Sequence, residues 1–357
     1  MPLNIPVTRT TSPKPIPADV GTSFGGYFTD HMFLMDYDVD RGWHDHRIVP
    51  FGNLSLHPSA AAIQYGQSIF DGYKAYRCQD DIIRLFRPHA HLDRINGSAA
   101  RLCMPAIDQA DVLEAMVRLV DLDRDWVPRQ PGTALYVRET MIGTEGFMAV
   151  RPSRRYTFMI FLSPVGSYYA EGSDPVRILA SEAHVRAARG GIGSAKAAAN
   201  YCASLLASEQ AKAEGHTQVL WLDSVERRYL EEVGTMNVML RVDDEIVTPP
   251  LSDSILPGVT RDTALALLRG WGERVSERQI AIEDVMAGIR SGAIAELWGL
   301  GTAAVVSPIG YLTYRGETVT VGDGKTGPTT SRLYDEITRL HTQAGDGPHG
   351  WRVAVPS

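Results

Sequence analysis

The stretch RGGIGSAKAAANY, residues 189–201, decides how the second half of the chain is interpreted. Small residues surround Lys196 and leave room for a flat ligand to approach its amine. A strand is predicted before the stretch, over Val176–Glu182, and an alanine-rich helix after it, over Ala198–Glu214. Gly215 ends that helix. The stretch therefore connects a strand to a helix and carries one lysine in a glycine-rich turn.

The amine of Lys196 could react with such a ligand, but two other interpretations of this lysine must be considered. A nucleotide-binding loop requires glycine directly before the lysine and serine or threonine directly after it. Ala195 and Ala197 stand at those places, so the pattern fails at two defining residues. Binding of ATP to the purified protein would favour this alternative. The other interpretation is an exposed lysine in a flexible turn.

Composition indicates a globular protein, with 44% hydrophobic and 22% charged residues among 357. A net charge of −7 without a basic stripe argues against a nucleic-acid partner. Three scattered cysteines suit a reducing compartment, and no run approaches the roughly 20 apolar residues of a membrane span. The N-terminus is polar and proline-rich, unlike a signal peptide. We therefore expect a cytoplasmic protein with no membrane span.

The remaining elements alternate without a regular strand–helix–strand pattern, which indicates an α+β (mixed α/β) fold. The segment SPVGSYYAEGSDP, Ser163–Pro175, is the best domain boundary because it is rich in proline and glycine. It predicts a smaller N-terminal α/β domain over residues 1–163, an interdomain loop over 164–175 and a larger domain over 176–357 that carries Lys196. Strands are predicted at 69–76, 82–86, 133–142, 155–162, 217–223 and 238–242, and helices at 90–103, 109–121, 260–271, 282–291 and 329–342.

Three further segments carry polar groups beside turns. In YLEEVGTMN, residues 229–237, a strand places Glu231 and Glu232 on opposite faces, so that one points inward. In SILPGVTRD, residues 254–262, the amides of Val259 and Thr260 begin a helix and offer a phosphate site. GLGTAAVV, residues 299–306, is a small-residue turn with a hydroxyl. His89 and His91 could suggest metal ligands, but no third ligand is in view and no metal is expected.

Taken in order, these motifs resemble a known family. RLFRPHAHLDRINGSAARLCMP, GSAK with the following NY, EEVGTMN, ILPGVTRD and GTAAVVSP are similar to the branched-chain aminotransferases of the larger, animal and actinobacterial type. The resemblance runs from about residue 24 to residue 355. It implies a two-domain fold-type IV enzyme that depends on pyridoxal 5'-phosphate.

The resemblance also assigns the cofactor residues. Lys196 matches the lysine that holds the cofactor as a Schiff base and then moves the substrate's α-proton. Glu232 matches the partner of the pyridine nitrogen, and Tyr201 the phenol that bonds O3′. Arg94 matches the arginine on the phosphate. The other residues expected to bind the cofactor are Thr235, Asn237, Leu256, Val259, Thr260 and Thr302.

For the substrate, the resemblance implies an apolar pocket with one reachable arginine. Arg138 would accept the distal carboxylate of glutamate, and the amides of Thr302 and Ala303 the α-carboxylate. The apolar walls would be Tyr65, Phe70 and Tyr168. Tyr65, Met148 and Val150 would come from the neighbouring subunit, which implies a homodimer. The predicted reaction is transamination between leucine, isoleucine or valine and 2-oxoglutarate.

The departures from the family pattern lie near the substrate residues. The usual Phe-Glu-Gly is Phe70-Asp71-Gly72, and Tyr73 replaces a leucine or methionine. Glu139 replaces a proline after Arg138, where we expect it to weaken the hold on a carboxylate. Trp298 and Leu300 replace a phenylalanine and a hydroxyl residue. These changes keep open an alternative: a same-fold aminotransferase for an unusual or aromatic amino acid in a specialised biosynthetic pathway.

Overall fold

The computed structural model describes residues 4–17, 24–166 and 174–356. Contacts divide the chain into two units. Unit 1 comprises Met1–Tyr168, Ala195–Ala199 and Leu340–Ser357, and unit 2 comprises Tyr169–Ser194 and Asn200–Arg339. Lys196 thus belongs by its contacts to unit 1, together with the end of the chain, whereas the sequence pattern assigned both to the second domain.

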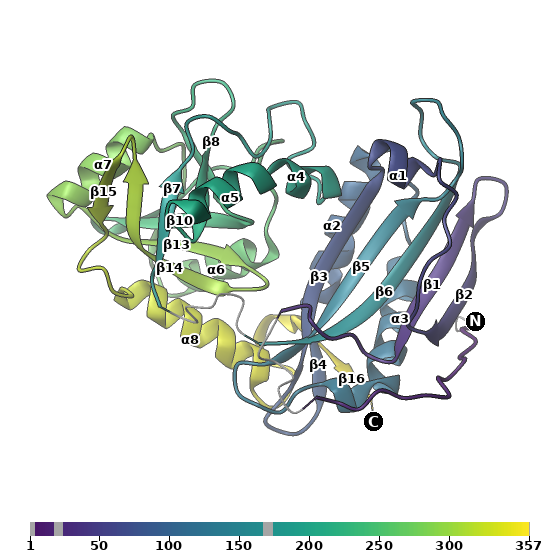
Figure 1. The fold of residues 1–357 in the computed structure, drawn as a ribbon. Helices are drawn as coiled ribbons and strands as arrows, with labels where there is room; N and C mark the ends of the chain where they lie inside the picture. The colour runs from purple at the N-terminus through teal and green to yellow at the C-terminus, as the bar shows by residue number, and fades with distance from the viewer. Residues whose placement is uncertain (1–3, 18–23, 167–173, 357) are drawn as a thin grey trace. The chain divides into compact units, whose positions relative to one another are not determined.

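Unit 1 is built on a seven-stranded sheet with the order β16-β4-β3-β5-β6-β1-β2 (Figure 1). Each pairing along this sheet is antiparallel. Its strands are β1 (His31–Asp38), β2 (Gly42–Pro50), β3 (Ser68–Arg77), β4 (Ile83–Phe86), β5 (Ala134–Gly143), β6 (Arg155–Val165) and β16 (Arg352–Val355). The strands β3 and β5 are buried along most of their length.

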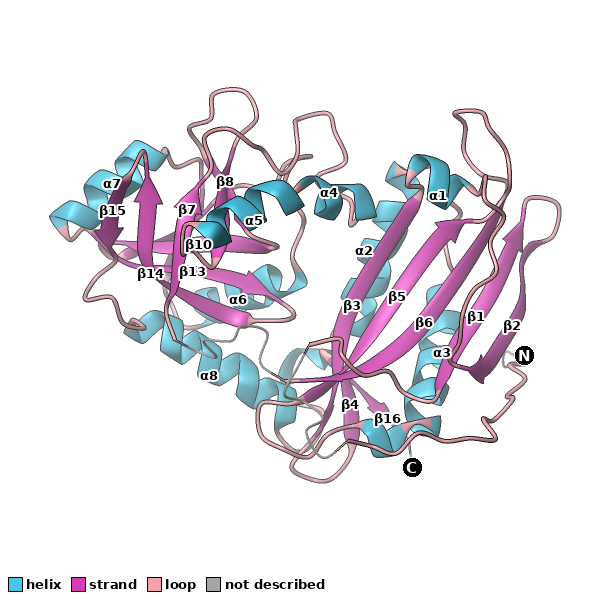
Figure 2. Cartoon of the chain, in the orientation of Figure 1, coloured by secondary structure: helices cyan, strands magenta, loops and turns pink. Residues whose placement is uncertain are grey.

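Two helices pack on one face of this sheet, α2 (Pro88–Arg101) and α3 (Gln109–Leu122) (Figure 2). The core between them includes Tyr73, Leu92, Ile95 and Met116. Asp108 caps α3 by accepting the amides of residues 110 and 111. The predicted start of α2 was two residues late, because Pro88 occupies its first turn, where proline's fixed φ suits a helix. Unit 1 also contains α1 (Ala61–Tyr65) and short 3-10 turns at Arg124–Trp126 and Pro348–Gly350.

Unit 2 is built on a nine-stranded sheet with the order β12-β11-β10-β13-β14-β7-β8-β9, with β15 beside β14. An additional pairing between β9 and β10 closes the central strands into a barrel. Closure removes free strand edges there. The strands are β7 (Val176–Ala180), β8 (Gln218–Leu222), β9 (Leu230–Val233), β10 (Met236–Val242), β11 (Glu245–Thr248), β12 (Arg274–Glu277), β13 (Ile294–Gly301), β14 (Val305–Tyr314) and β15 (Glu317–Thr320).

The helices α5 (Leu205–Ala213), α6 (Val259–Gly270) and α7 (Ile282–Ser291) belong to unit 2, and α4 (Ala198–Ala203) and α8 (Pro328–Thr342) cross the unit boundary. The single helix predicted over residues 198–214 is divided at Ser204. Its amide and hydroxyl both donate to the carbonyl of Tyr201, three residues back, which tightens the turn.

The mixed α+β fold predicted from the sequence is confirmed by these two sheets and their helices. Within the described ranges, no helix has both the length and the apolar character needed to cross a bilayer.

Candidate active site

The backbone of Lys196 is fixed to β3 and α2 in unit 1. Its amide donates to Oγ of Ser98 at 2.9 Å, and its carbonyl accepts the amide of Phe70 at 3.0 Å. The next residue, Ala197, forms an isolated bridge with Ile69. The glycine-rich turn is therefore followed by a segment that adds briefly to the seven-stranded sheet, so the position of the lysine is set by rigid elements.

The amine of Lys196 lies in a setting that favours its neutral form. Its Nζ is 5.1 Å from the ring centroid of Phe70. Burial lowers the pKa of Lys196 to about 8, with a further lowering by the Arg94 guanidinium and an opposing effect of Asp71. A lysine with this pKa carries a useful fraction of free amine near neutral pH, as a nucleophile or proton carrier requires.

Arg94, from α2, is held by a buried carboxylate. Its Nε and Nη2 donate to the two oxygens of Asp71 at 2.7 and 2.6 Å. Nδ1 of His91, one helical turn earlier, lies 2.8 Å from the same carboxylate. Burial by itself would raise the pKa of Asp71, but Arg94 and His91 hold it below its usual range. The carboxylate therefore stays ionised and fixes one edge of the guanidinium.

A pocket of about 330 Å³ opens on the other face of the seven-stranded sheet. Arg138 contributes the charge in its lining, with its guanidinium 4.6 Å from the ring centroid of Phe70 and 5.2 Å from that of Tyr136. Phe24, Phe28 and Phe161 complete an aromatic wall. The sequence-predicted residues Phe70 and Arg138 thus meet in one apolar pocket with a single guanidinium.

Glu139 does not face this pocket, because neighbouring residues of a strand point to opposite faces. It is fully buried in the core side of the sheet, where Oε1 accepts the hydroxyl of Tyr73 at 3.0 Å. Burial and the nearby Asp71 raise its pKa to about 8. The expected weakening of Arg138 by Glu139 is therefore not supported by their positions.

Tyr65 lies apart from the pocket lining. It ends α1 and is 43% exposed, with its ring centroid 6.3 Å from that of Phe147. Met148 and Val150, which follow Phe147, are 86% and 90% exposed. The predicted substrate residue Tyr168 falls outside the described residues.

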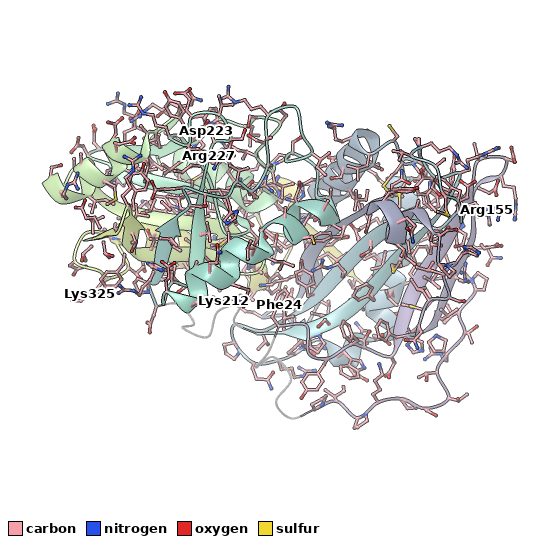
Figure 3. All side chains as sticks on the ribbon, turned by 45° about the horizontal axis from the view of Figure 1, so that its top comes forward. Phe24, Arg155, Lys212, Asp223, Arg227 and Lys325 are labelled. Carbon is pink, nitrogen blue, oxygen red and sulfur yellow. The ribbon has the colours of Figure 1, made fainter. Side chains whose placement is uncertain are left out.

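In unit 2, a turn organised by Asp223 leads into β9. The buried carboxylate of Asp223 accepts the amides of Val225, Glu226, Arg228 and Tyr229 at 2.7 to 3.0 Å. Figure 3 shows Asp223 beside Arg227, whose guanidinium donates to the carbonyls of residues 182 and 183. This packing fixes the start of the strand that carries Glu231 and Glu232.

Glu232 is buried and accepts a backbone amide. Oε1 receives the amide of Leu256 at 2.7 Å, and Oε2 lies 2.8 Å from Nε of Arg186. Asn237, paired with Glu232 across the β9–β10 turn, donates to the carbonyl of Leu256 at 2.9 Å. Three predicted cofactor residues, Glu232, Asn237 and Leu256, are therefore linked by hydrogen bonds. Glu231 instead bonds Ser254 at 2.5 Å.

The remaining predicted residues of unit 2, apart from Tyr201, lie at element ends or in turns. Val259 and Thr260 are the first residues of α6, where helix amides point outward along the axis. Thr302 and Ala303 form the turn between β13 and β14, and Thr235 is exposed in the β9–β10 turn. Tyr201 lies in α4.

The two substitutions near the Thr302 turn are both buried. Trp298 and Leu300 are 0% and 1% exposed. Among the described residues, the indole nitrogen of Trp298 has no hydrogen-bond partner. Gly299 lies between them, and a Cβ there would approach the methyl group of Met236 to 2.5 Å, so that side chain would have to shift.

Sequence reasoning missed four residues that contact the predicted set: Asp71 and His91 beside Arg94, Ser98 beneath Lys196, and Arg186 beside Glu232. His91 and Ser98 share a helix face with Arg94, at spacings of three and four residues, and this periodicity could have identified them. Within the described parts of the chain, no cluster of three metal-ligating side chains occurs, and His91 is bonded to Asp71.

The chain matches known proteins along nearly all of its length. The family model "Amino-transferase class IV" matches residues 68–311. Branched-chain-amino-acid aminotransferase 2 of Bacillus subtilis is 48% identical over 99% of this chain and 97% of its own length. Branched-chain-amino-acid aminotransferase of Mycolicibacterium smegmatis is 41% identical over 99% of both chains.

Solved structures agree with these matches. The crystal structure of the Escherichia coli branched-chain amino acid aminotransferase has a TM-score of 0.76 and 25% identity, covering 91% of this chain and 99% of that one. The family pattern suggested by the motifs around Lys196, Glu232 and Thr302 is thus confirmed over the whole length. The chain belongs to the branched-chain-amino-acid aminotransferases of the class IV aminotransferase family.

Proposed function

We propose that the protein transfers the amino group of leucine, isoleucine or valine to 2-oxoglutarate with pyridoxal 5'-phosphate as cofactor. The observation that carries the proposal is the lysine at the centre of the family's motif, because burial lowers the pKa of Lys196 to about 8 beside Arg94. Relatives with 48% and 49% identity are named as branched-chain-amino-acid aminotransferases. A lysine held partly neutral is what covalent attachment of an aldehyde cofactor requires.

Each unit contains residues whose chemistry suits pyridoxal phosphate. When bound, pyridoxal phosphate supplies an electron sink for the carbanion that forms at the substrate α-carbon. Lys196 holds the cofactor covalently and, when released, carries the α-proton. Arg94 takes the phosphate. The ionised Asp71 balances the charge of this arginine within the buried side of unit 1.

Unit 2 supplies groups of complementary chemistry. Glu232, anchored by the amide of Leu256 and by Arg186, is a fixed carboxylate that suits a protonated ring nitrogen. The start of α6, at Val259 and Thr260, has the amide dipole that favours a phosphate. The resemblance adds Tyr201 at O3′, Leu256 and Thr235 at the ring, and Asn237 and Thr302 nearby.

The pocket beside Phe70 and Arg138 would receive the substrate side chain. Its aromatic wall suits branched aliphatic groups, and its single guanidinium suits the distal carboxylate of glutamate or 2-oxoglutarate. The amides of Thr302 and Ala303 would take the α-carboxylate. Tyr168 is proposed as a further wall residue from the family pattern alone.

A homodimer is part of this proposal. Tyr65, Met148 and Val150 are large apolar side chains with 43%, 86% and 90% exposure, and a second copy of the chain would cover them. The three unpaired cysteines favour a cytoplasmic location. The family pattern supports two functional domains, 1–163 and 176–357, joined by residues 164–175.

The test is the visible absorbance spectrum of the purified protein. A yellow chromophore that bleaches with L-leucine and returns with 2-oxoglutarate would demonstrate both half-reactions. The Lys196→Ala variant should fold but lose turnover; turnover at the wild-type rate would contradict the assignment.

A second candidate is transamination of an aromatic or unusual amino acid. The observation that favours it is the number of aromatic side chains around the pocket, among them Phe24, Phe28, Tyr136 and Phe161. A panel of amino donors separates the two candidates. Phenylalanine or tyrosine accepted with a higher kcat/KM than leucine would favour the second.

A further inference from the structure

We propose that Asp71 is a positioning residue that orients Arg94 toward the phosphate of the cofactor, and that His91 and the Tyr73–Glu139 pair keep Asp71 in place. The inference rests on the proposed function, since it concerns the residue expected to bind the phosphate. It adds roles for four buried side chains that do not themselves touch the cofactor.

The first step is the geometry of the Asp71–Arg94 pair. Nε and Nη2 of Arg94 donate to separate carboxylate oxygens at 2.7 and 2.6 Å. Such a two-point contact fixes the plane of a guanidinium as well as its position. Asp71 is 0% exposed on β3, so the surrounding residues confine its side chain. One edge of the Arg94 guanidinium therefore binds Asp71, and this contact sets the direction in which the opposite edge points.

The second step is what holds Asp71. His91 places Nδ1 2.8 Å from Oδ1, and the amide of Gly72 donates to the same oxygen at 2.6 Å. Burial lowers the pKa of His91 to about 4, so the neutral ring donates its proton to the carboxylate. The ring of His91 stacks on Tyr73, with centroids 4.6 Å apart.

The third step is the charge of the neighbouring carboxyl group. Glu139 pairs with Asp71 across β3 and β5, and both are 0% exposed. Two carboxylates so close in a buried site would repel one another strongly. The raised pKa of Glu139, about 8, leaves it neutral at pH 7. Asp71 therefore carries the one negative charge that balances Arg94, while Glu139 serves Tyr73 as a hydrogen-bond acceptor.

The opposite role for Asp71 makes a different prediction. A carboxylate that merely neutralised Arg94 would compete with the phosphate, and its removal would strengthen cofactor binding. A carboxylate that orients Arg94 would have the reverse effect. The sign of the change on removing the charge therefore decides between the two.

The experiment compares two ligands on the full-length protein after cofactor removal. Pyridoxal phosphate and pyridoxal, which lacks the phosphate, are titrated against wild type, D71N, R94Q and D71N/R94Q, and binding is followed by absorbance. We expect D71N to weaken pyridoxal phosphate by about 10- to 100-fold, the range for loss of a hydrogen bond to a charged group. Pyridoxal binding should change little, and the double variant should resemble R94Q.

Two further variants keep the test decisive. D71E retains a carboxylate and should keep most of the preference for pyridoxal phosphate over pyridoxal. H91Q should weaken this preference, as D71N does, and it replaces D71N in the test if D71N does not fold. The matched control is D123N, because Asp123 is also a buried carboxylate bonded to a histidine, His31, at 2.6 Å. D123N should leave the ratio of the two affinities unchanged.

Four results would overturn the inference: tighter or unchanged binding of pyridoxal phosphate by D71N, equal weakening of both ligands, or additive effects of D71N and R94Q. A wild-type protein that binds neither ligand would overturn the proposed function as well. A wild-type protein that binds pyridoxal phosphate, with a D71N variant that binds it equally, would overturn this inference alone.

Discussion

The hydroxyl of Tyr73 donates a 3.0 Å hydrogen bond to Glu139 between neighbouring strands of the seven-stranded sheet. The same hydroxyl contacts the sulfur of Met116 on α3. Both Tyr73 and Glu139 depart from the expected family pattern, and in the structure they contact each other. The polar group introduced at one position is accommodated by the polar group at the other, which is the condition for burying either.

Glu139 should make the stability of the protein depend on pH. Its pKa in the fold is about 8, against an ordinary value near 4.5, because of burial and Asp71. The stability that the neutral form contributes is full below about pH 4.5 and is lost as pH rises through 8, because the unfolded chain releases this proton first. The free energy of unfolding of wild type relative to E139Q should fall between pH 5 and 8 by at most about 1.4 kcal/mol per pH unit.

The measurement is urea denaturation at several pH values, with E145Q as the control. The Arg151 guanidinium holds the pKa of Glu145 below its ordinary value. Glu145 is therefore mostly ionised above pH 5 in both the folded and the unfolded protein. The difference between wild type and E145Q should therefore be constant over the same range. A constant difference for E139Q as well would mean that Glu139 is ionised in the fold.

Arg138→Met should separate the two half-reactions. The apolar pocket around Phe70 remains, so leucine should still donate its amino group with little loss. The acceptor carboxylate of 2-oxoglutarate would lose its charged partner, and its kcat/KM should fall by about 10- to 100-fold. Single-turnover measurements with each substrate, followed by absorbance, distinguish the two effects.

The control for this variant is Arg155→Gln. Arg155 is exposed on β6 (Figure 3) and pairs with Asp38. Removing it should change neither half-reaction. Equal losses with leucine and 2-oxoglutarate in Arg138→Met would assign Arg138 a structural role instead.

The amine of Lys196 should react as a group with a pKa near 8 in the cofactor-free protein. Burial and Arg94 both lower that pKa, and Asp71 opposes them. Competitive acetylation at a series of pH values, read by mass spectrometry, gives the midpoint. The midpoint should move up in R94Q, where a positive charge is lost, and down in D71N, where a negative charge is lost. Shifts of the same sign in both variants would contradict this electrostatic account.

Much of the fold could be predicted from local sequence. The strands β3 to β6 and the helices α3, α6 and α7 follow their expected ranges within a few residues, because periodicity and capping are local. The strands β1, β2 and β16 of unit 1 were not predicted. The placement of Glu139 away from Arg138 also follows from strand alternation, although the substitution beside the arginine suggested the contrary.

The contacts around the site could not be predicted in this way. Asp71 meets Arg94 only because β3 and α2 pack in one register, and Lys196 meets Ser98 across nearly a hundred residues of sequence. Arg186, which pairs with Glu232, stands in a segment without a pattern of its own. Such pairs depend on tertiary packing, so the sequence identified the reactive residues better than those that orient them.

Gly72→Ala should test how closely β3 approaches the pocket. A Cβ at residue 72 would overlap the hydroxyl and ring of Tyr136 on the neighbouring strand β5, where Tyr136 pairs with Lys74. The backbone of Gly72 is ordinary for an L-residue, so the effect should come from this overlap alone. Tyr136 lines the pocket and lies 5.2 Å from the guanidinium of Arg138, so its displacement should raise KM for leucine and for 2-oxoglutarate together.

Second-site variants identify the cause. Tyr136→Phe should not relieve the effect of Gly72→Ala, since the ring as well as the hydroxyl would be overlapped. Tyr136→Ala should relieve the overlap, so the loss in thermal stability from Gly72→Ala should be smaller in its presence. Gly97→Ala on α2 is the matched control, because a Cβ at that glycine would meet no atom within 4 Å. Additive losses of stability in Gly72→Ala/Tyr136→Ala would show that the two positions do not interact.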